Sequence, residues 1–163
     1  TTLFRSGPSH PTPLTDSWDG KGVRVLVVDD NEQNLELLEA YLEDLNCELA
    51  LARDGLEALE SVAAARPDII LLDVMMPRMS GFQACSKLKG DAATRDIPIV
   101  MVTALNEVSD VERAIECGAD DFLSKPVNKL ELLTRVKSLV RISKMQQELQ
   151  RALTQLRSFR DGA

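Results

Sequence analysis

The chain has 163 residues, 44% of them hydrophobic, and a net charge of −7. No uninterrupted apolar run approaches the roughly 20 residues that cross a bilayer, so we expect one globular domain and no membrane segment. Residues 1–127 hold 11 Lys and Arg against 23 Asp and Glu. This acidic body should repel nucleic acid, so we expect no direct nucleic-acid partner.

The first 22 residues are rich in Ser, Thr, Pro and Gly and show no hydrophobic periodicity. We predict that residues 1–22 form a mobile N-terminal arm. The arm lacks the basic and long apolar regions of a secretory signal. Three cysteines, Cys47, Cys85 and Cys117, are odd in number and lie far apart within apolar stretches. They indicate buried thiols in a reducing, cytoplasmic environment.

From residue 23 onward, short aliphatic runs alternate with longer segments of helical period. The predicted strands cover residues 23–28, 47–52, 68–73 and 97–103, with a weaker fifth at 119–124. The predicted helices cover residues 31–45, 54–65, 80–89, 107–117 and 128–159. Asn31 and Asp54 are suited to cap the first two helices. The order is five repeats of strand followed by helix.

Strands that are apolar on both faces need cover on both sides, and each intervening helix supplies a right-handed crossover. The pattern therefore predicts an α/β fold, with a doubly wound, parallel, five-stranded sheet between two helical layers. In the flavodoxin-like strand order 2-1-3-4-5, the binding crevice lies at the carboxyl ends of strands 1 and 3.

The last predicted helix continues well past the repeats, and residues 144–163 form a helical extension. Ile142, Leu149 and Leu156 recur every seven residues, as do Leu139, Gln146 and Leu153. This seam, interrupted by one polar residue, is typical of a two-stranded coiled coil and indicates a homodimer. A long amphipathic helix that folds back on its own domain is the alternative. In its first half we expect four residues to pack on the domain: Leu130, Leu133, Val136 and Val140.

Three carboxylates follow strands 1 and 3 of the predicted sheet. Asp29 and Asp30 end the first strand, and Asp73 ends the third. Carboxylates about 4 Å apart repel each other by several kcal/mol at an effective dielectric constant near 20, so the cluster requires a proton or a cation. An all-oxygen site with few protein ligands suits Mg2+, which keeps several waters and accepts a phosphate oxygen.

A hydroxyl and an ammonium group join the same edge of the sheet. Thr103 ends the fourth strand, and Lys125 follows the fifth. Both can contact oxygens of a phosphoryl group while a carboxylate attacks the phosphorus in line. Asp73 is the best nucleophile because its strand is central and a tight loop follows it. Asp29 and Asp30 would then hold the metal.

At these residues the chain resembles the receiver domain of two-component response regulators. Four segments carry the resemblance within residues 23–143: VLVVDDN (25–31), PDIILLDVMMPRMSG (67–81), PIVMVTA (98–104) and GADDFLSKP (118–126). The resemblance implies that Asp73 accepts a phosphoryl group from a sensor histidine kinase or a phosphotransfer protein. It also implies that the backbone carbonyl of Met75 ligates Mg2+ together with the three aspartates.

The resemblance further implies a conformational switch and a regulatory rather than an enzymatic domain. Thr103 moves inward when the phosphoryl group binds, and an aromatic side chain fills the vacated space. Here that side chain is Phe122, where the family often has Tyr, and a plain core Phe is the alternative. The Lys125–Pro126 peptide bond is expected to be cis. The switch would act through the fourth helix, fifth strand and last helix. Either a linked output domain lies outside this chain, or the protein is a single-domain regulator that works by docking.

Two other functions compete with this interpretation. A haloacid-dehalogenase-like phosphatase also places Asp, Thr and Lys around Mg2+, but it needs a second Asp two residues after the nucleophile, where this chain has Met75. A flavodoxin-like FMN carrier shares the fold. However, an acidic crevice opposes the flavin phosphate, and no phosphate-binding loop follows the first strand.

Overall fold

The computed structural model describes residues 20–104 and 108–162. It contains a five-stranded parallel sheet in the order β2-β1-β3-β4-β5, as the sequence predicts. The strands are β1 (Arg24–Val28), β2 (Glu48–Ala52), β3 (Ile69–Asp73), β4 (Ile99–Thr103) and β5 (Asp121–Ser124). The arm predicted for residues 1–22 lies almost wholly outside the described residues.

Helices follow the strands in the predicted alternation. They are α1 (Glu32–Leu42), extended by the short helix η2 (Glu43–Leu45), α2 (Gly55–Ala64), α3 (Gly81–Gly90), α4 (Val108–Glu116) and α5 (Lys129–Asp161). Asn31 caps α1 and Asp54 caps α2, as predicted, since each side chain accepts a backbone N–H of the first turn. Ser80 and Gln83 form a capping box on α3 that the sequence analysis did not identify.

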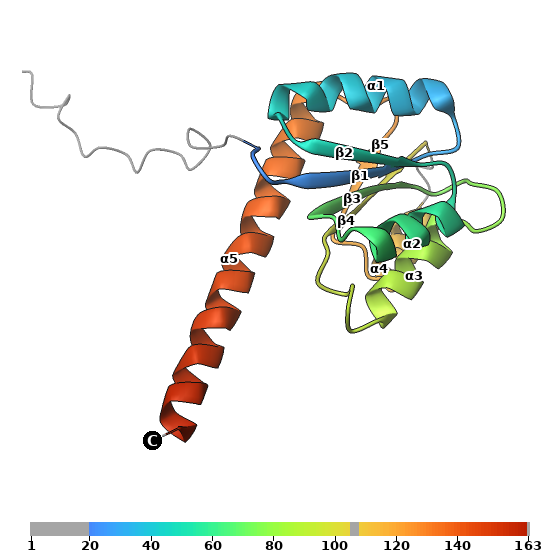
Figure 1. Cartoon of the computed structure of the whole chain (residues 1–163). Helices are drawn as coiled ribbons and strands as arrows, with labels where there is room; N and C mark the ends of the chain where they lie inside the picture. Colours follow the sequence, from blue (N-terminus) through green and yellow to red (C-terminus); the bar gives the residue numbers. More distant parts are fainter. Residues whose placement is uncertain (1–19, 105–107, 163) are drawn as a thin grey trace, which may run out of the picture.

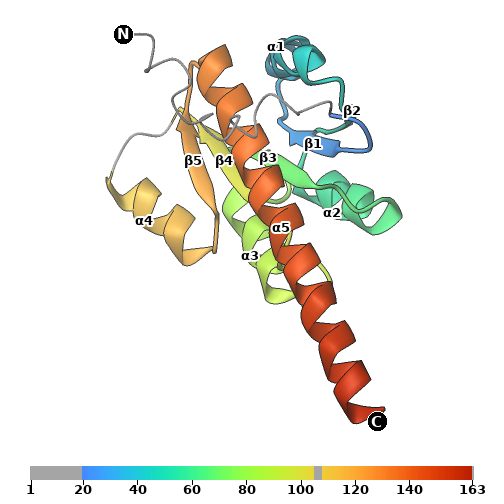
Figure 2. The ribbon, with the colours of Figure 1, turned by 90° about the vertical axis from the view of Figure 1, so that its left-hand side faces the viewer.

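The sheet, which lies between helices in Figures 1 and 2, separates two hydrophobic clusters. Alternate residues of the central strands point to opposite faces, so Leu26 joins the cluster with α2, α3 and α4. Its neighbour Val27 joins the cluster with α1 and α5. Strands β3 and β4 are buried along their whole length. Because both faces are covered, the rim formed by the strand ends is where polar groups can gather.

All three cysteines are free thiols, and Cys85 and Cys117 are buried as predicted, whereas Cys47 is only half-buried. Burial raises the pKa of Cys47 and, more strongly, that of Cys85. Over the described ranges, we find no helix that combines the length and the apolar character needed to span a bilayer.

Helix α5 consists of two unlike halves. In the first half, Val136 and Val140 are fully buried, as predicted, and Leu133 packs against the same cluster. Leu130 corrects the prediction, because it is 74% exposed and Leu132 is buried in its place. At about 100° per residue, Leu130 lies about 120° around the helix from Val136, so it misses the packed face.

The second half of α5 extends away from the domain (Figure 1). Its large apolar side chains are 40% to 84% exposed. We call this set the exposed stripe: Ile142, Met145, Leu149, Leu153, Leu156 and Phe159. Counted at about 100° per residue, the stripe lies on nearly the opposite side of the helix from Val136 and Val140. The extension therefore does not fold back on its own domain.

Candidate phosphoacceptor site

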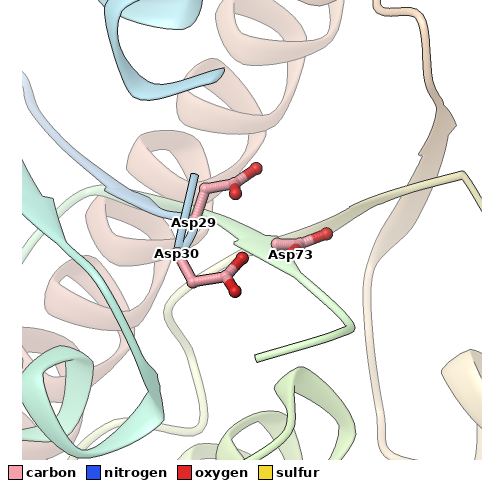
Figure 3. A group of neighbouring side chains, drawn as sticks. All are labelled: Asp29, Asp30 and Asp73. Carbon is pink, nitrogen blue, oxygen red and sulfur yellow. The ribbon is translucent and has the colours of Figure 1, made fainter. Parts of the chain in front are cut away.

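Three aspartates meet at the carboxyl ends of β1 and β3. One carboxylate oxygen from each of Asp29, Asp30 and Asp73 can be chosen so that all lie within 4.8 Å of one another. Figure 3 shows the three side chains next to each other at the rim of the sheet. We call this set the acidic rim. Asp29 is 1% exposed and Asp73 is 5% exposed, whereas Asp30 faces solvent.

The backbone fixes the position of Asp29. Its Oδ1 atom accepts the backbone N–H of Asn31 at 2.9 Å and the side-chain amide of Asn34 at 3.4 Å. Both donors belong to the start of α1, so the helix that follows β1 orients the carboxylate. Asn34 is a contact that sequence reasoning missed, and only its place one turn into a helix directly after the acidic pair could have indicated it.

Lys125 reaches the acidic rim from the loop after β5. Its ammonium group donates to Asp29 Oδ2 at 2.8 Å and to Asp73 Oδ1 at 3.1 Å. Burial alone would lower the pKa of Lys125, but the two carboxylates outweigh it and the pKa is raised. The ammonium group is therefore charged at neutral pH. The Lys125–Pro126 peptide bond is cis.

The surroundings of Asp73 disfavour its ionised form. Burial and the neighbouring charge of Asp29 raise its pKa from 3.8 to about 6, although Lys125 acts in the opposite direction. Three carboxylates face one ammonium group, so the charge of this cluster remains negative when all are ionised. An oxygen-rich, partly buried cluster with excess negative charge fits a small dication such as Mg2+.

The other predicted residues lie around this cluster. Thr103 is 1% exposed at the end of β4, and its carbonyl accepts the backbone N–H of Lys125 at 2.8 Å. Asp73 pairs with Val102 in the sheet, so Thr103 extends one residue beyond the level of the phosphoacceptor candidate. Phe122 lies in β5 and packs against the cluster under α2, α3 and α4.

The loop after β3 carries Met75, whose side chain is 66% exposed. The start of α3 holds this loop tightly, because the Gly81 N–H donates to the Val74 carbonyl at 2.9 Å. A Cβ at position 81 would overlap the carbonyl oxygen of Asp73, so only glycine permits this approach. Gly81 therefore supports the site, and only its place in the segment after Asp73 could have indicated this role from the sequence.

Comparison with known proteins agrees with this geometry. The response regulator receiver domain family matches residues 25–137. The chain belongs to this family. Residues 25–137 are therefore a regulatory domain of phosphorelay signalling, a function that the phosphatase and FMN-carrier alternatives do not share.

Two curated relatives illustrate the similarity. The response regulator PleD of Caulobacter vibrioides is 51% identical over 126 residues, covering 77% of this chain and 28% of PleD. The response regulator MprA of Mycobacterium tuberculosis is 43% identical over 122 residues, covering 75% of this chain and 52% of MprA. The chain thus spans between about a quarter and a half of the length of these relatives.

Solved receiver domains show the same fold. The receiver domain of a histidine kinase from Syntrophus aciditrophicus has a TM-score of 0.70 and 39% identity, covering 73% of this chain and 90% of that one. The receiver domain of a sensor histidine kinase from Pseudomonas aeruginosa PAO1 has a TM-score of 0.68 and 31% identity, covering 73% of this chain and 98% of that one. The latter structure holds a magnesium ion in its active-site cleft.

Proposed function

We propose that Asp73 accepts a phosphoryl group from a sensor histidine kinase or a phosphotransfer protein, in a reaction that depends on Mg2+. The carboxylate of Asp73 attacks phosphorus, a bond forms between phosphorus and a carboxylate oxygen, and the bond from phosphorus to the donor's histidine nitrogen breaks. The observation that carries this proposal is the convergence of three carboxylates and Lys125 at one rim.

Each residue of the rim has a defined task in this proposal. Asp29, Asp30 and Asp73 hold the metal together with the backbone carbonyl of Met75. When bound, Mg2+ supplies positive charge that the phosphoryl oxygens need as they approach the carboxylates. Lys125 leaves its ion pairs with Asp29 and Asp73 to neutralise another phosphoryl oxygen, and the Thr103 hydroxyl donates to a third.

The reaction is a single acceptance of a phosphoryl group rather than turnover of a substrate. The position two residues after Asp73 is occupied by Met75, which can neither protonate a leaving group nor activate water. The acyl phosphate can therefore persist as a signal. We place this regulatory domain in the cytoplasm with its kinase, and we assign any enzymatic output to a linked domain outside this chain.

Intact mass after incubation with acetyl phosphate and Mg2+ tests the proposal. We expect one added phosphoryl group on the wild-type chain and none on Asp73→Asn. Asp96→Asn, which changes an exposed aspartate away from the rim, is the matched control and should be modified like the wild type. Continuous phosphate release without a stable adduct would favour the phosphatase instead.

We further propose that residues 23–143 form the switching unit and residues 144–163 a coiled-coil linker that pairs two copies of the chain. Thr103 and Phe122 would shift the face formed by α4, β5 and α5, from which the linker continues directly. The exposed stripe supports this arrangement, because it turns away from its own domain and offers an apolar seam about 26 Å long.

Light scattering with and without beryllofluoride and Mg2+ tests the linker. We expect the dimer population or the helix cross-linking to change on activation, and Leu149→Lys to weaken the dimer. Gln147→Lys adds the same charge to the opposite side of the helix and is the control. A monomer under both conditions, with unchanged cross-linking, would contradict the proposal.

A further inference from the structure

The loop that links Asp73 to α3 also contacts the turn between β2 and α2. This β3–α3 loop, residues 74–80, carries the Met75 carbonyl, to which the proposed function gives a metal-binding role. Its two ends are held by the hydrogen bond between Gly81 and Val74. Its middle reaches across to the turn between β2 and α2, where it meets Asp54 and Gly55.

Arg78 makes the polar part of that contact. Its Nε donates to Asp54 Oδ2 at 3.0 Å, and its NH2 group donates to the same oxygen. The backbone of Arg78 is left-handed, with φ of 65°, a conformation that is unfavourable for a residue other than glycine. A residue in this conformation persists only where its surroundings hold it there. The ion pair with Asp54 is one such restraint.

Asp54 is a fixed anchor for the loop. Its Oδ1 atom accepts the backbone N–H of Glu57 at 2.9 Å and so caps α2, while its side chain is only 6% exposed. The Glu57 hydrogen bond and then Arg78 lower the pKa of Asp54, so it is ionised at neutral pH. Both carboxylate oxygens are therefore committed, one to α2 and one to the loop.

Next to this ion pair, Met79 makes an apolar contact with the same turn. A Cβ on Gly55 would lie 2.8 Å from the Met79 Cβ, so the loop and the turn are already in close contact. Met79 is also partly buried against the core. The apolar contact and the ion pair thus both join the loop to the turn before α2, and Arg78 lies three residues from Met75.

We propose that the Asp54–Arg78 pair is a brace that positions the β3–α3 loop and thereby sets the Mg2+ affinity of the acidic rim. This inference rests on the proposed function, because it assumes that the rim binds Mg2+. Arg78 is 58% exposed, and exposed ion pairs contribute little to stability. The effect of the pair is therefore expected on the position of the loop and not on the stability of the fold. Mg2+ binding depends strongly on the positions of its ligands, so a displacement of the Met75 carbonyl would weaken it.

The signs of two substitutions separate a brace from long-range electrostatics. Arg78→Ala removes a positive charge and, through charge alone, would strengthen the binding of a cation. Asp54→Asn removes a negative charge and would weaken it, while Asn still caps α2. A brace predicts that both substitutions weaken Mg2+ binding, because either one releases the loop.

Calorimetric titration of the full chain with Mg2+ at physiological salt tests the brace. We expect Arg78→Ala and Asp54→Asn each to raise the Mg2+ dissociation constant about 3- to 10-fold, with the double variant no weaker than the single ones. Arg78→Gly removes the side chain but suits the left-handed backbone, and it should lose the same affinity. Arg78→Lys should restore part of it.

Arg53→Ala is the matched control. Arg53 lies on the same turn as Asp54, but its ion-pair partner is Glu32 of α1 and not a residue of the loop. The Mg2+ dissociation constant of Arg53→Ala should stay within twofold of the wild-type value. If Arg78→Ala and Arg78→Gly also stay within twofold, packing of Met79 alone positions the loop and the brace is overturned. A wild-type chain without Mg2+ affinity would overturn the proposed function as well, so the two failures are distinguishable.

Discussion

The acidic rim and the exposed stripe depart from an ordinary protein surface in opposite ways. The rim buries like charges that would be more stable in water, and the stripe exposes apolar side chains that would be more stable inside. Both lie at the ends of well-packed elements, so neither results from a poor core. Each region carries a free-energy cost in the isolated chain. A cation would relieve this cost at the rim, and an apolar surface would relieve it at the stripe.

The difference between the two regions is geometric. The rim is pre-formed, because backbone hydrogen bonds and Lys125 already orient Asp29 and Asp73. The stripe is regular but has no second surface among the described residues of this chain. A ligand can therefore bind the rim with little rearrangement, whereas the stripe requires a second molecule or segment. In the proposed function, the signal is received at the first region and passed on at the second.

Removing one carboxylate from the rim is the strongest challenge to this comparison. Asp29→Asn deletes a proposed ligand and a partner of Lys125, and we expect it to weaken Mg2+ binding about 100-fold or more, because even indirect supporting residues contribute about 10- to 100-fold. Calorimetric titration measures the effect, with Asp96→Asn as the control. An affinity within threefold of the wild type would mean that the rim needs no dication.

Shortening one buried side chain in the first half of α5 measures the packing energy that the exposed second half lacks. Val136→Ala removes two buried methyl groups, and we expect it to lower the free energy of unfolding by about 2 kcal/mol. Urea denaturation followed by circular dichroism measures this change. A loss below about 0.5 kcal/mol would show that α5 contributes little to the core, contrary to the full burial of Val136.

The burial cost at the rim predicts a stabilising substitution. Because the folded-state pKa of Asp73, about 6, exceeds its ordinary 3.8, the folded chain holds a proton that the unfolded chain has released between about pH 4 and 6. The stability of metal-free protein therefore falls as pH rises through this window. Asp73→Asn should raise the free energy of unfolding at pH 7 by about 1–3 kcal/mol in EDTA.

The same measurement at pH 4 supplies the control, because the gain from Asp73→Asn should nearly vanish where the wild-type carboxyl is protonated in the folded protein. Saturating Mg2+ at pH 7 should stabilise the wild type and reduce the difference. Equal stability of the two proteins in EDTA at pH 7 would show that ionising Asp73 does not destabilise the folded, metal-free protein.

The smallest effect is expected on the exposed stripe. Leu149→Ala should change the unfolding free energy of the dilute, monomeric chain by no more than about 0.5 kcal/mol, since its side chain loses no buried contacts. The same substitution should weaken the proposed dimer in light scattering. If it destabilises the monomer as much as Val136→Ala does, the stripe packs on its own domain after all.

Much of this protein follows from local pattern. Alternating runs of strand and helix period predict the elements, and the right-handed crossover rule limits the ways in which they can assemble. Asp29 and Asp73 could be placed together because parallel strands end at the same edge of the sheet. The seven-residue spacing of Ile142 and Leu149 likewise indicates a seam without any knowledge of the fold.

Tertiary structure alone decided the contacts between segments that have no fixed spacing along the chain. Arg78 meets Asp54 across 24 residues, and no periodicity relates the pair. The sequence placed Lys125 at the same edge of the sheet as Asp29, but only the structure shows its ammonium group 2.8 Å from that carboxylate. Which leucine of α5 enters the core depended on how the helix is rotated against the sheet, so Leu132 is buried and Leu130 is not. Sequence determines which elements form through short-range preferences, whereas distances between elements depend on packing of the whole chain.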